Sequence, residues 1–237
     1  MTELDPRVAA TTVVTGPADL VGNTLVSVDE VKLTGQVVHL PASIPGVPQY
    51  AAVARAEAEA NALWPRLIGG LDRRGPIPYQ PDAALVIGFQ AAAGSAIAGA
   101  VTGLEAFSSH HLGRFAAPGQ PVIYDGKPYT LRKLRDAYSL NERYAEVMPA
   151  VMGVSRPTQE PWWPTLRRIQ GLAALDRHAV TEPARRSGLT GEKSLVQRLC
   201  DREYVGAAQM MLAVFEHFSP GWISRQRASQ LPPPPES

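Results

Sequence analysis

The sequence has one cysteine and almost no net charge, and each shortage excludes a class of protein. Cys200 has no second cysteine to pair with, which excludes an intramolecular disulfide and a cysteine-built metal site and fits a reducing compartment such as the cytoplasm. The 23 basic and 22 acidic residues give a formal net charge of +1. The whole chain therefore has no overall attraction to nucleic acid, and any such binding needs a local basic patch.

The familiar short motifs of enzymes are also missing. The sequence contains no G-x-S-x-G, no Walker phosphate-binding loop, no H-E-x-x-H and no dinucleotide fingerprint. The adjacent His110 and His111 do not share a helix face and have no third ligand at a suitable spacing, so we expect no metal and no cofactor. The N-terminal residues MTELDPRVAATT lack the apolar run of a signal peptide.

One uncharged stretch, residues 83–104, is long enough to cross a bilayer. Ala and Gly make up most of it, and Gln90 lies near its middle. Alanine adds almost nothing to membrane insertion, while glycine and glutamine oppose it, so we expect a buried helix of a soluble protein rather than a membrane span. Gly99 and Gly103 suit close packing against another helix in either setting.

Hydrophobic residues make up 45% of the chain, which is enough for a sizeable core. Val, Thr, Gly and Pro are frequent in residues 1–48, which we interpret as a β-rich segment with a linker. Residues 49–219 show helical periodicity, and residues 220–237 are expected to be a flexible Pro-rich tail. The predicted fold class is mainly α, a helical bundle of about five helices with a small N-terminal β segment. The strands are expected at 12–15, 24–28 and 31–40, and residues 33–35 indicate a turn.

Apolar residues at helical spacing predict a first long helix over residues 49–71. Pro65 lies inside it and is expected to kink the helix without dividing it by a loop. A second long helix is predicted from Asp82, a suitable N-cap, to about Arg114.

Local signals predict the shorter elements that follow. Asp125-Gly126 predicts a small hairpin, Thr130 a helix start, and Ser139-x-x-Glu142 a capping box at the start of another helix. Two more helical regions are predicted, over residues 162–176 and roughly over residues 192–218.

Two stretches carry a resemblance to a known family. One is AAAGSAIAGAVTGLEAF, which ends at Phe107, and the other is PWWPTLRRIQGLAALDRHAVTEP, residues 161–183. They resemble the HEPN superfamily (higher eukaryotes and prokaryotes nucleotide-binding), in which a small-residue helix ends in Leu-Glu-Ala-Phe and another helix carries Arg, a polar residue, spacers and His. Many members are ribonucleases of toxin–antitoxin and defence systems. The resemblance covers roughly residues 49–219 and implies an all-α homodimer.

The resemblance implies a degenerate site at Arg177, His178 and Glu182. Arg177 matches the family's arginine and His178 the polar residue beside it, while Glu182 holds the place of the catalytic histidine. A carboxylate there gives no cationic donor and would repel a phosphate. We therefore expect a catalytically degenerate protein that binds RNA, a nucleotide or a protein partner. The alternatives are a metal-independent ribonuclease that uses Arg177 and His178 in another arrangement, and a structural or assembly protein of a larger complex.

The basic residues of this region also have a structural interpretation. Arg177 and His178 suit the dipole at a helix C-terminus, and Asp176 or Glu182 can pair with them. A second group of arginines is a candidate phosphate-binding patch, although a solvated helix face is the favoured interpretation of it. The members of this group are Arg167, Arg168, Arg185 and Arg186.

Overall fold

The computed structural model describes residues 28–33, 36–41, 45–69, 80–115, 120–179 and 194–222. The chain divides into two compact units, one of residues 1–44 with 221–237 and one of residues 45–220. The second unit is built of helices, and the strands of the described residues form two small antiparallel hairpins. The fold is therefore mainly α with a small β segment.

The first unit contains a two-stranded antiparallel sheet. β1 (Val28–Leu33) pairs with β2 (Gln36–Pro41), with Val31 opposite Val38 and Leu33 opposite Gln36. The prediction of one strand over 31–40 is wrong, because Leu33 and Gln36 are cross-strand partners and the run is split between the two strands. The predicted strand at 12–15 lies outside the described residues.

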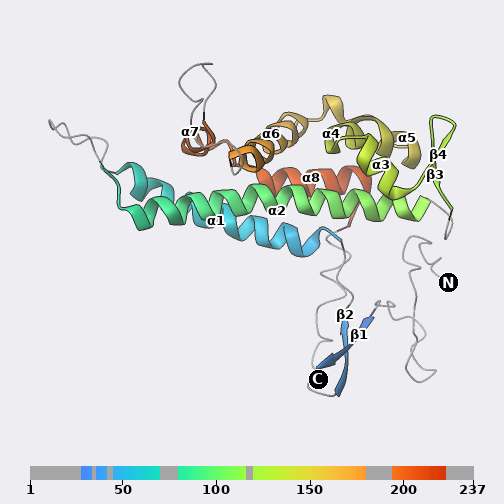
Figure 1. Cartoon of the computed structure of the whole chain (residues 1–237), viewed down its shortest axis with the longest axis horizontal. Coiled ribbons are helices and arrows are strands. Elements are labelled where there is room, and N and C mark those ends of the chain that lie inside the picture. Colours follow the sequence, from blue (N-terminus) through green and yellow to red (C-terminus); the bar gives the residue numbers. More distant parts are fainter. Residues whose placement is uncertain are drawn as a thin grey trace, which may run out of the picture. The chain divides into compact units, whose positions relative to one another are not determined.

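In the second unit, the long helices α1 (Val47–Ile68) and α2 (Ala83–Phe115) lie side by side (Figure 1). α1 runs through Pro65 without a loop, as predicted, and ends three residues before the predicted end at Leu71. α2 begins where predicted, because the Asp82 Oδ1 atom accepts a hydrogen bond of 2.8 Å from the backbone N–H of Ala84.

Two glycines of α2 allow its neighbours to come close. A Cβ atom at Gly99 would lie 2.8 Å from Cγ2 of Val53 on α1. A Cβ atom at Gly103 would overlap the Met211 side chain of α8 (Ala207–Phe218) and lie 2.9 Å from Cβ of Gln49. The predicted close packing at these two glycines is confirmed, and the helices on both sides of α2 depend on it.

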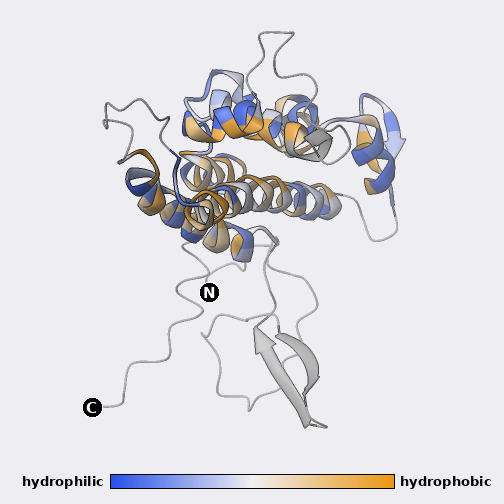
Figure 2. Ribbon diagram, turned by 60° about the vertical axis from the view of Figure 1, so that its left-hand side comes forward, coloured by the Kyte–Doolittle hydropathy of each residue, from blue (hydrophilic) through white to orange (hydrophobic). Residues whose placement is uncertain are grey.

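The core lies where the other helices pack on α2. The rings of Phe107 on α2 and Phe215 on α8 stack with centroids 4.5 Å apart. Hydrophobic residues gather where the helices of this unit face one another, while the β3–β4 hairpin is mostly hydrophilic (Figure 2). The largest fully buried apolar and aromatic side chains include Phe89, Leu104, Leu134, Tyr144, Met148, Leu166, Ile169, Leu172 and Tyr204.

The segment after α2 begins with a tight hairpin. β3 (Val122–Tyr124) pairs with β4 (Lys127–Tyr129) through Asp125 and Gly126, which both have positive φ, at 50° and 69°. This is the predicted turn, and two positive φ values are typical of the type I′ hairpin. Thr130 then caps α3 (Leu131–Ala137), since its side chain accepts a hydrogen bond from the backbone N–H of Lys133.

The predicted capping box is also present. Ser139 and Glu142 exchange side-chain-to-backbone hydrogen bonds at the start of α4 (Leu140–Glu142). The chain continues as a π-helix, η2 (Arg143–Val147), and then as α5 (Met148–Met152). A single 3₁₀ turn, η3 (Pro157–Gln159), leads to α6 (Trp163–Ala179). The apolar face predicted for α6, from Trp162 to Ala173, is buried.

The last helical region is interrupted, which corrects the prediction of one region over 192–218. α7 (Leu195–Cys200) and α8 are separated by residues 201–206, where Arg202 and Gly206 have positive φ. A side chain of α1 stabilises this interruption. The Glu57 carboxylate accepts hydrogen bonds from the backbone N–H groups of Gly206 at 2.7 Å and Ala208 at 3.0 Å. It therefore caps the N-terminus of α8, where a negative charge also suits the helix dipole.

Candidate functional site: a polar cavity between α2, α3, η2 and α6

The residues singled out by the family resemblance lie mostly outside the described part of the chain. The backbone of α6 includes positions 177 and 178, and the side chains of Arg177 and His178 are not among those described. Glu182, Arg185 and Arg186 fall in residues 180–193, also outside. The predicted site at these positions stays a prediction.

The other two predicted phosphate-binding residues lie on described turns of α6. Arg168 is half-buried, and its Nη2 atom donates a 2.9 Å hydrogen bond to the carbonyl oxygen of Val205. This bond ties α6 to the connection between α7 and α8, which is a structural role. Arg167 is exposed and borders a cavity.

This cavity has a volume of about 490 Å³ and lies on one side of α2, under α3, α4, η2 and α6. We call it the polar cavity, because charged and amide side chains border it. Its lining comprises Val101, Glu105, Arg135, Tyr138, Ser139, Leu140, Asn141, Arg143, Arg167, Gln170, Gly171, Ala173 and Ala174.

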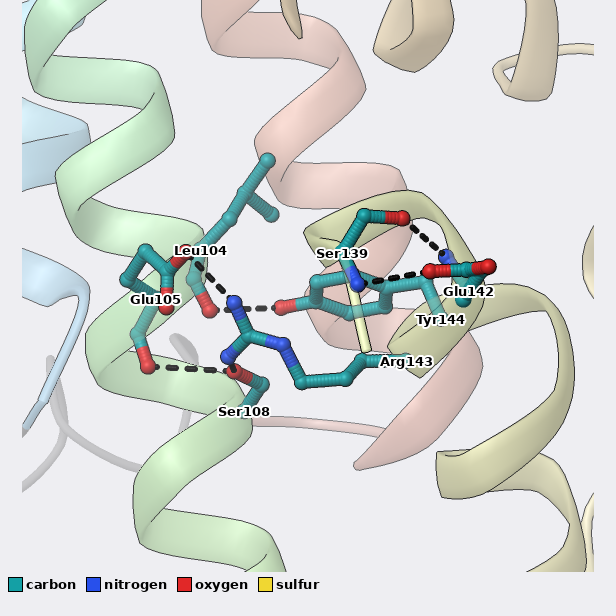
Figure 3. A network of polar contacts seen from close by, with 7 residues as sticks. All are labelled: Leu104, Glu105, Ser108, Ser139, Glu142, Arg143 and Tyr144. Atoms are coloured by element: carbon teal, nitrogen blue, oxygen red, sulfur yellow. Dashed lines mark hydrogen bonds and ion pairs between the residues drawn. The ribbon is translucent and has the colours of Figure 1, made fainter. Parts of the chain in front are cut away.

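A buried arginine is the main charged group of the cavity. Arg143 is 3% exposed, and its Nη2 atom donates to Glu105 Oε1 at 2.5 Å while its Nη1 atom donates to Ser108 Oγ at 3.1 Å (Figure 3). The Ser108 hydroxyl donates in turn to the carbonyl oxygen of Glu105, 3.1 Å away. A buried charge needs such partners, so this network fixes the guanidinium in one position against α2.

Two consecutive residues of the π-helix both reach α2. Arg143 and Tyr144 begin η2, and the Tyr144 hydroxyl donates a 2.8 Å hydrogen bond to the carbonyl oxygen of Leu104, the residue before Glu105 (Figure 3). Burial raises the pKa of Tyr144 far above its usual value, so the phenol stays protonated and remains a donor. Single π-helical turns are often found at functional sites, which makes this position notable.

Four side-chain atoms of the cavity lining are buried and have no hydrogen-bond partner among the described residues. Two are acceptors, Glu105 Oε2 and Asn141 Oδ1, and two are donors, Arg143 Nε and Gln170 Nε2. Buried polar groups in proteins are almost always satisfied, by protein, water or ligand. Solvent reaches none of these four atoms, so they face neighbouring protein atoms rather than the cavity and do not indicate an occupant.

The opening of the cavity is positively charged. Arg135 and Arg167 are exposed at its border, from α3 and α6. With Arg143 and Glu105 included, the described residues of the lining carry three arginines and one glutamate, a net charge of +2. On α6 the lining positions 167, 170, 171 and 174 repeat at helical spacing, so they lie on one face of the helix.

A tyrosine cluster forms one wall near this opening. Tyr138 borders the cavity and contacts Tyr124 and Tyr129 of the β3–β4 hairpin edge-to-face, with centroids 5.5 Å and 5.9 Å away. The Tyr129 and Tyr138 hydroxyl oxygens are 3.3 Å apart. This hydrogen bond, with burial as the lesser cause, raises the pKa of Tyr138 to about 12. Tyr138 is therefore neutral at physiological pH.

The sequence analysis singled out two charged residues of this cavity, Arg167 and Glu105, and missed the buried Arg143. Arg167 was predicted as a phosphate ligand, and Glu105 belongs to the Leu-Glu-Ala-Phe stretch. Arg143 was missed, although the sequence carries a signal for it. It sits at the i+3 position of an apolar series whose other members are Leu140, Tyr144, Val147 and Met148. A charged residue inside such a buried face requires a partner.

The histidine pair gives no metal site in the described part of the chain. No group of three His, Cys, Asp or Glu residues there is placed to hold a metal ion. The rings of His110 and His111 contact each other edge-to-face, and burial, followed by the charge of Arg114, lowers the pKa of His110. His110 is therefore more readily neutral than an exposed histidine.

α2 also passes the simple test for a membrane span. Among the described residues, Ala83–Arg114 is the one helix whose length and composition would allow it to cross a bilayer, and 33% of its most apolar window is buried within the structure. Its buried side chains include Phe89, Ala96, Leu104 and Phe107. α2 thus contributes to the core of the helical unit.

Comparison with known proteins adds no relative. No family model matches the chain, and neither the curated proteins nor the solved structures include a match. The resemblance to the HEPN superfamily therefore stays a prediction, and the chemistry of the polar cavity carries the functional argument.

Proposed function

We propose that this is a binding protein that holds a small ligand with a phosphate or carboxylate group in the polar cavity. The observation that carries the proposal is the positive charge of the described lining, in which three arginines, the buried Arg143 among them, accompany the single carboxylate of Glu105. Arg135 and Arg167 at the opening supply the charge that such an anionic group needs.

Binding is better supported than turnover by the groups that line the cavity. The one carboxylate among the described residues of its lining, Glu105, is held by Arg143. Its aliphatic hydroxyl, Ser139, accepts the capping hydrogen bond from the Glu142 N–H. Neither group is placed as a general base or an activated nucleophile.

The sequence resemblance supports a choice among anions. In a catalytically degenerate HEPN-like protein, the anionic group would be the phosphate of a nucleotide or of RNA. Arg167 belongs both to the cavity and to the arginines that the sequence marks as phosphate ligands. Nucleotides and short single-stranded RNA are therefore the first ligands to test.

The proposal is tested by thermal-shift measurements on wild type and on two double variants. Arg135→Gln with Arg167→Gln removes both charges at the opening. The matched control, Arg132→Gln with Lys133→Gln, removes two exposed charges of α3 that do not border the cavity. We expect phosphate-bearing ligands to raise the melting temperature of wild type and of the control. In the first variant, most of this rise should be lost. Equal ligand effects in both variants would contradict the proposal.

A second candidate function, docking to a protein, is favoured by exposed hydrophobic side chains. Ile87 on α2 is 65% exposed and Val196 on α7 is 50% exposed. A groove of about 160 Å³, bordered by Val196 and by Ile97 of α2, lies between these helices. We propose that such surfaces support a homodimer. Light scattering should give a dimer mass at micromolar concentration and a lower mass for Ile87→Asp, whereas a wild-type monomer would contradict this.

A further inference from the structure

We infer that the ligand of the polar cavity carries an aromatic ring in addition to its anionic group, and that this ring packs against the side chain of Tyr138. The inference rests on the proposed function and adds the chemical class of the ligand. Its basis is the size of the cavity and the part of the lining that solvent, and therefore a ligand, can reach.

The cavity is larger than a bare anion requires. Its volume of about 490 Å³ falls within the range of about 300–1,000 Å³ that is usual for pockets that hold organic ligands. An inorganic phosphate would fill a small part of this space and would leave the uncharged lining in contact with water. The charged opening therefore accounts for one end of the ligand, and the rest of the cavity for an organic body.

Part of the accessible lining is apolar or aromatic. Val101 of α2, Tyr138 at the end of α3, and Gly171 and Ala174 of α6 border the cavity and are half-exposed. Covering apolar surface of this kind is favourable in water. The body of the ligand should therefore have an apolar face, so that a sugar phosphate without an aromatic ring is only a partial match.

Gly171 leaves room for a group of substantial size. A Cβ atom added to this residue would meet nothing in the described structure within 4 Å. Because Gly171 borders the cavity, bare helix backbone forms this part of the wall. A flat ring can lie close to such a surface, whereas a long side chain at this position would occupy the same space.

Tyr138 supplies an aromatic partner in a fixed position. Its ring contacts Tyr124 and Tyr129 edge-to-face, and the hydroxyl oxygens of Tyr129 and Tyr138 are 3.3 Å apart. Little conformational freedom is then lost when a ligand packs against it. The neutral phenol does not repel an anion. Arg135 lies three residues earlier on α3, so a ligand with its anionic group at Arg135 brings its ring near Tyr138.

Nucleotides and simple aryl phosphates share this chemistry, and two pairs of probes distinguish them. The first pair is adenosine 5′-monophosphate and ribose 5-phosphate, and the second is phenyl phosphate and methyl phosphate. Each pair keeps the phosphate and removes the ring. In calorimetric titration of wild type, the ring-bearing member of one pair should bind at least ~10-fold more tightly, because stacking on an aromatic side chain contributes on this scale. The pair that shows this preference identifies the source of the ring.

Three variants of the tyrosine cluster test the contact itself. Tyr138→Leu should remove most of the preference for the ring-bearing member, whereas Tyr138→Phe keeps the ring and should retain the wild-type ratio. Tyr129→Leu is the matched control, because Tyr129 belongs to the same cluster and is not among the described lining residues of the cavity. Equal losses of the preference in Tyr129→Leu and Tyr138→Leu would show that the cluster acts through the fold, and would overturn the inference.

A pair of glycines tests the space without changing the tyrosines. Gly171→Leu fills part of the cavity and should weaken the ring-bearing member more than the ring-lacking one. Gly94→Leu is the control, since a Cβ atom there also meets nothing within 4 Å and the residue borders the groove between α2 and α7 instead. If both members of each pair bind equally to wild type, the inference is overturned while the proposed function stands. If no probe binds, the proposed function fails and the inference with it.

Discussion

Replacing Arg143 by methionine removes the buried charge of the polar cavity and leaves Glu105 without its ion-pair partner. Methionine retains most of the volume of the arginine stem, so the main loss is electrostatic and in hydrogen bonds to Glu105 and Ser108. Breaking a fully buried ion pair costs about 3–5 kcal/mol. Glu105 is 34% exposed, and water screens the stranded carboxylate. We therefore expect a loss of about 2–3 kcal/mol in the free energy of unfolding.

The double variant Arg143→Met with Glu105→Met separates the pair from the packing. Replacing both partners by apolar side chains removes the uncompensated charge, so we expect stability within about 1 kcal/mol of wild type. Urea unfolding followed by circular dichroism at 222 nm measures each variant, since the midpoint shifts while the slope stays constant. Arg132→Met is the control, because its ion pair with Asp136 at 3.7 Å is exposed and worth under about 0.5 kcal/mol. A loss below about 1 kcal/mol for Arg143→Met, or additive losses in the double variant, would refute the reasoning.

Three further predictions concern other parts of the structure. Glu57→Ala removes the cap of α8 and should lower the free energy of unfolding by about 1–2 kcal/mol in urea unfolding. The control Glu59→Ala, at an exposed position of α1, should cost under about 0.5 kcal/mol, and equal losses in the two variants would show that the cap is unimportant. Gly103→Ala should cost about 1–3 kcal/mol because its Cβ atom meets Gln49 and Met211, whereas Gly94→Ala has free space and should be neutral or stabilising by up to about 1 kcal/mol. Tyr138 should titrate near pH 12 by ultraviolet absorbance, and Tyr129→Phe should lower its pKa. Because the folded pKa is the higher one, this contribution to stability is present below about pH 10 and is lost as the pH rises toward 12; an unchanged titration in the variant would contradict the assigned cause.

Local signals in the sequence predict many of the boundaries in this fold. The turn at Asp125-Gly126, the Thr130 cap and the Ser139–Glu142 capping box each depend on a few neighbouring residues, and each is confirmed. The close approach at Gly103 also follows from residue size alone. These features need no knowledge of the tertiary structure.

The interruption between α7 and α8 could not be read in the same way. The apolar series that predicts the last helix begins at Tyr204, inside the interruption, so it gives no sign of a break there. The chain breaks because Gly206 adopts a positive φ of 89° and because Glu57, about 150 residues earlier, caps the new helix. A cap from a distant helix leaves no local trace in the sequence.

The polar cavity was predictable only in part, for the same physical reason. Its lining comes from α2, from the α3–η2 segment and from α6, and no short motif links Glu105, Arg143 and Arg167. Arg167 could be named from a basic pair on a helix. Arg143 could have been found as a charge within a buried apolar series, but its partner Glu105 is 38 residues away.

The central claim, that the polar cavity binds an anionic ligand, is tested most directly by calorimetric titration of adenosine 5′-monophosphate into wild type and the Arg135→Gln, Arg167→Gln variant. Loss of two charge-assisted contacts should raise the dissociation constant at least ~10-fold, which is a loss of about 1.4 kcal/mol in binding free energy. The Arg132→Gln, Lys133→Gln control, with the same change in net charge, should keep the wild-type value. Equal weakening in both variants, or no weakening in either, would show that the anion binds elsewhere and would contradict the account.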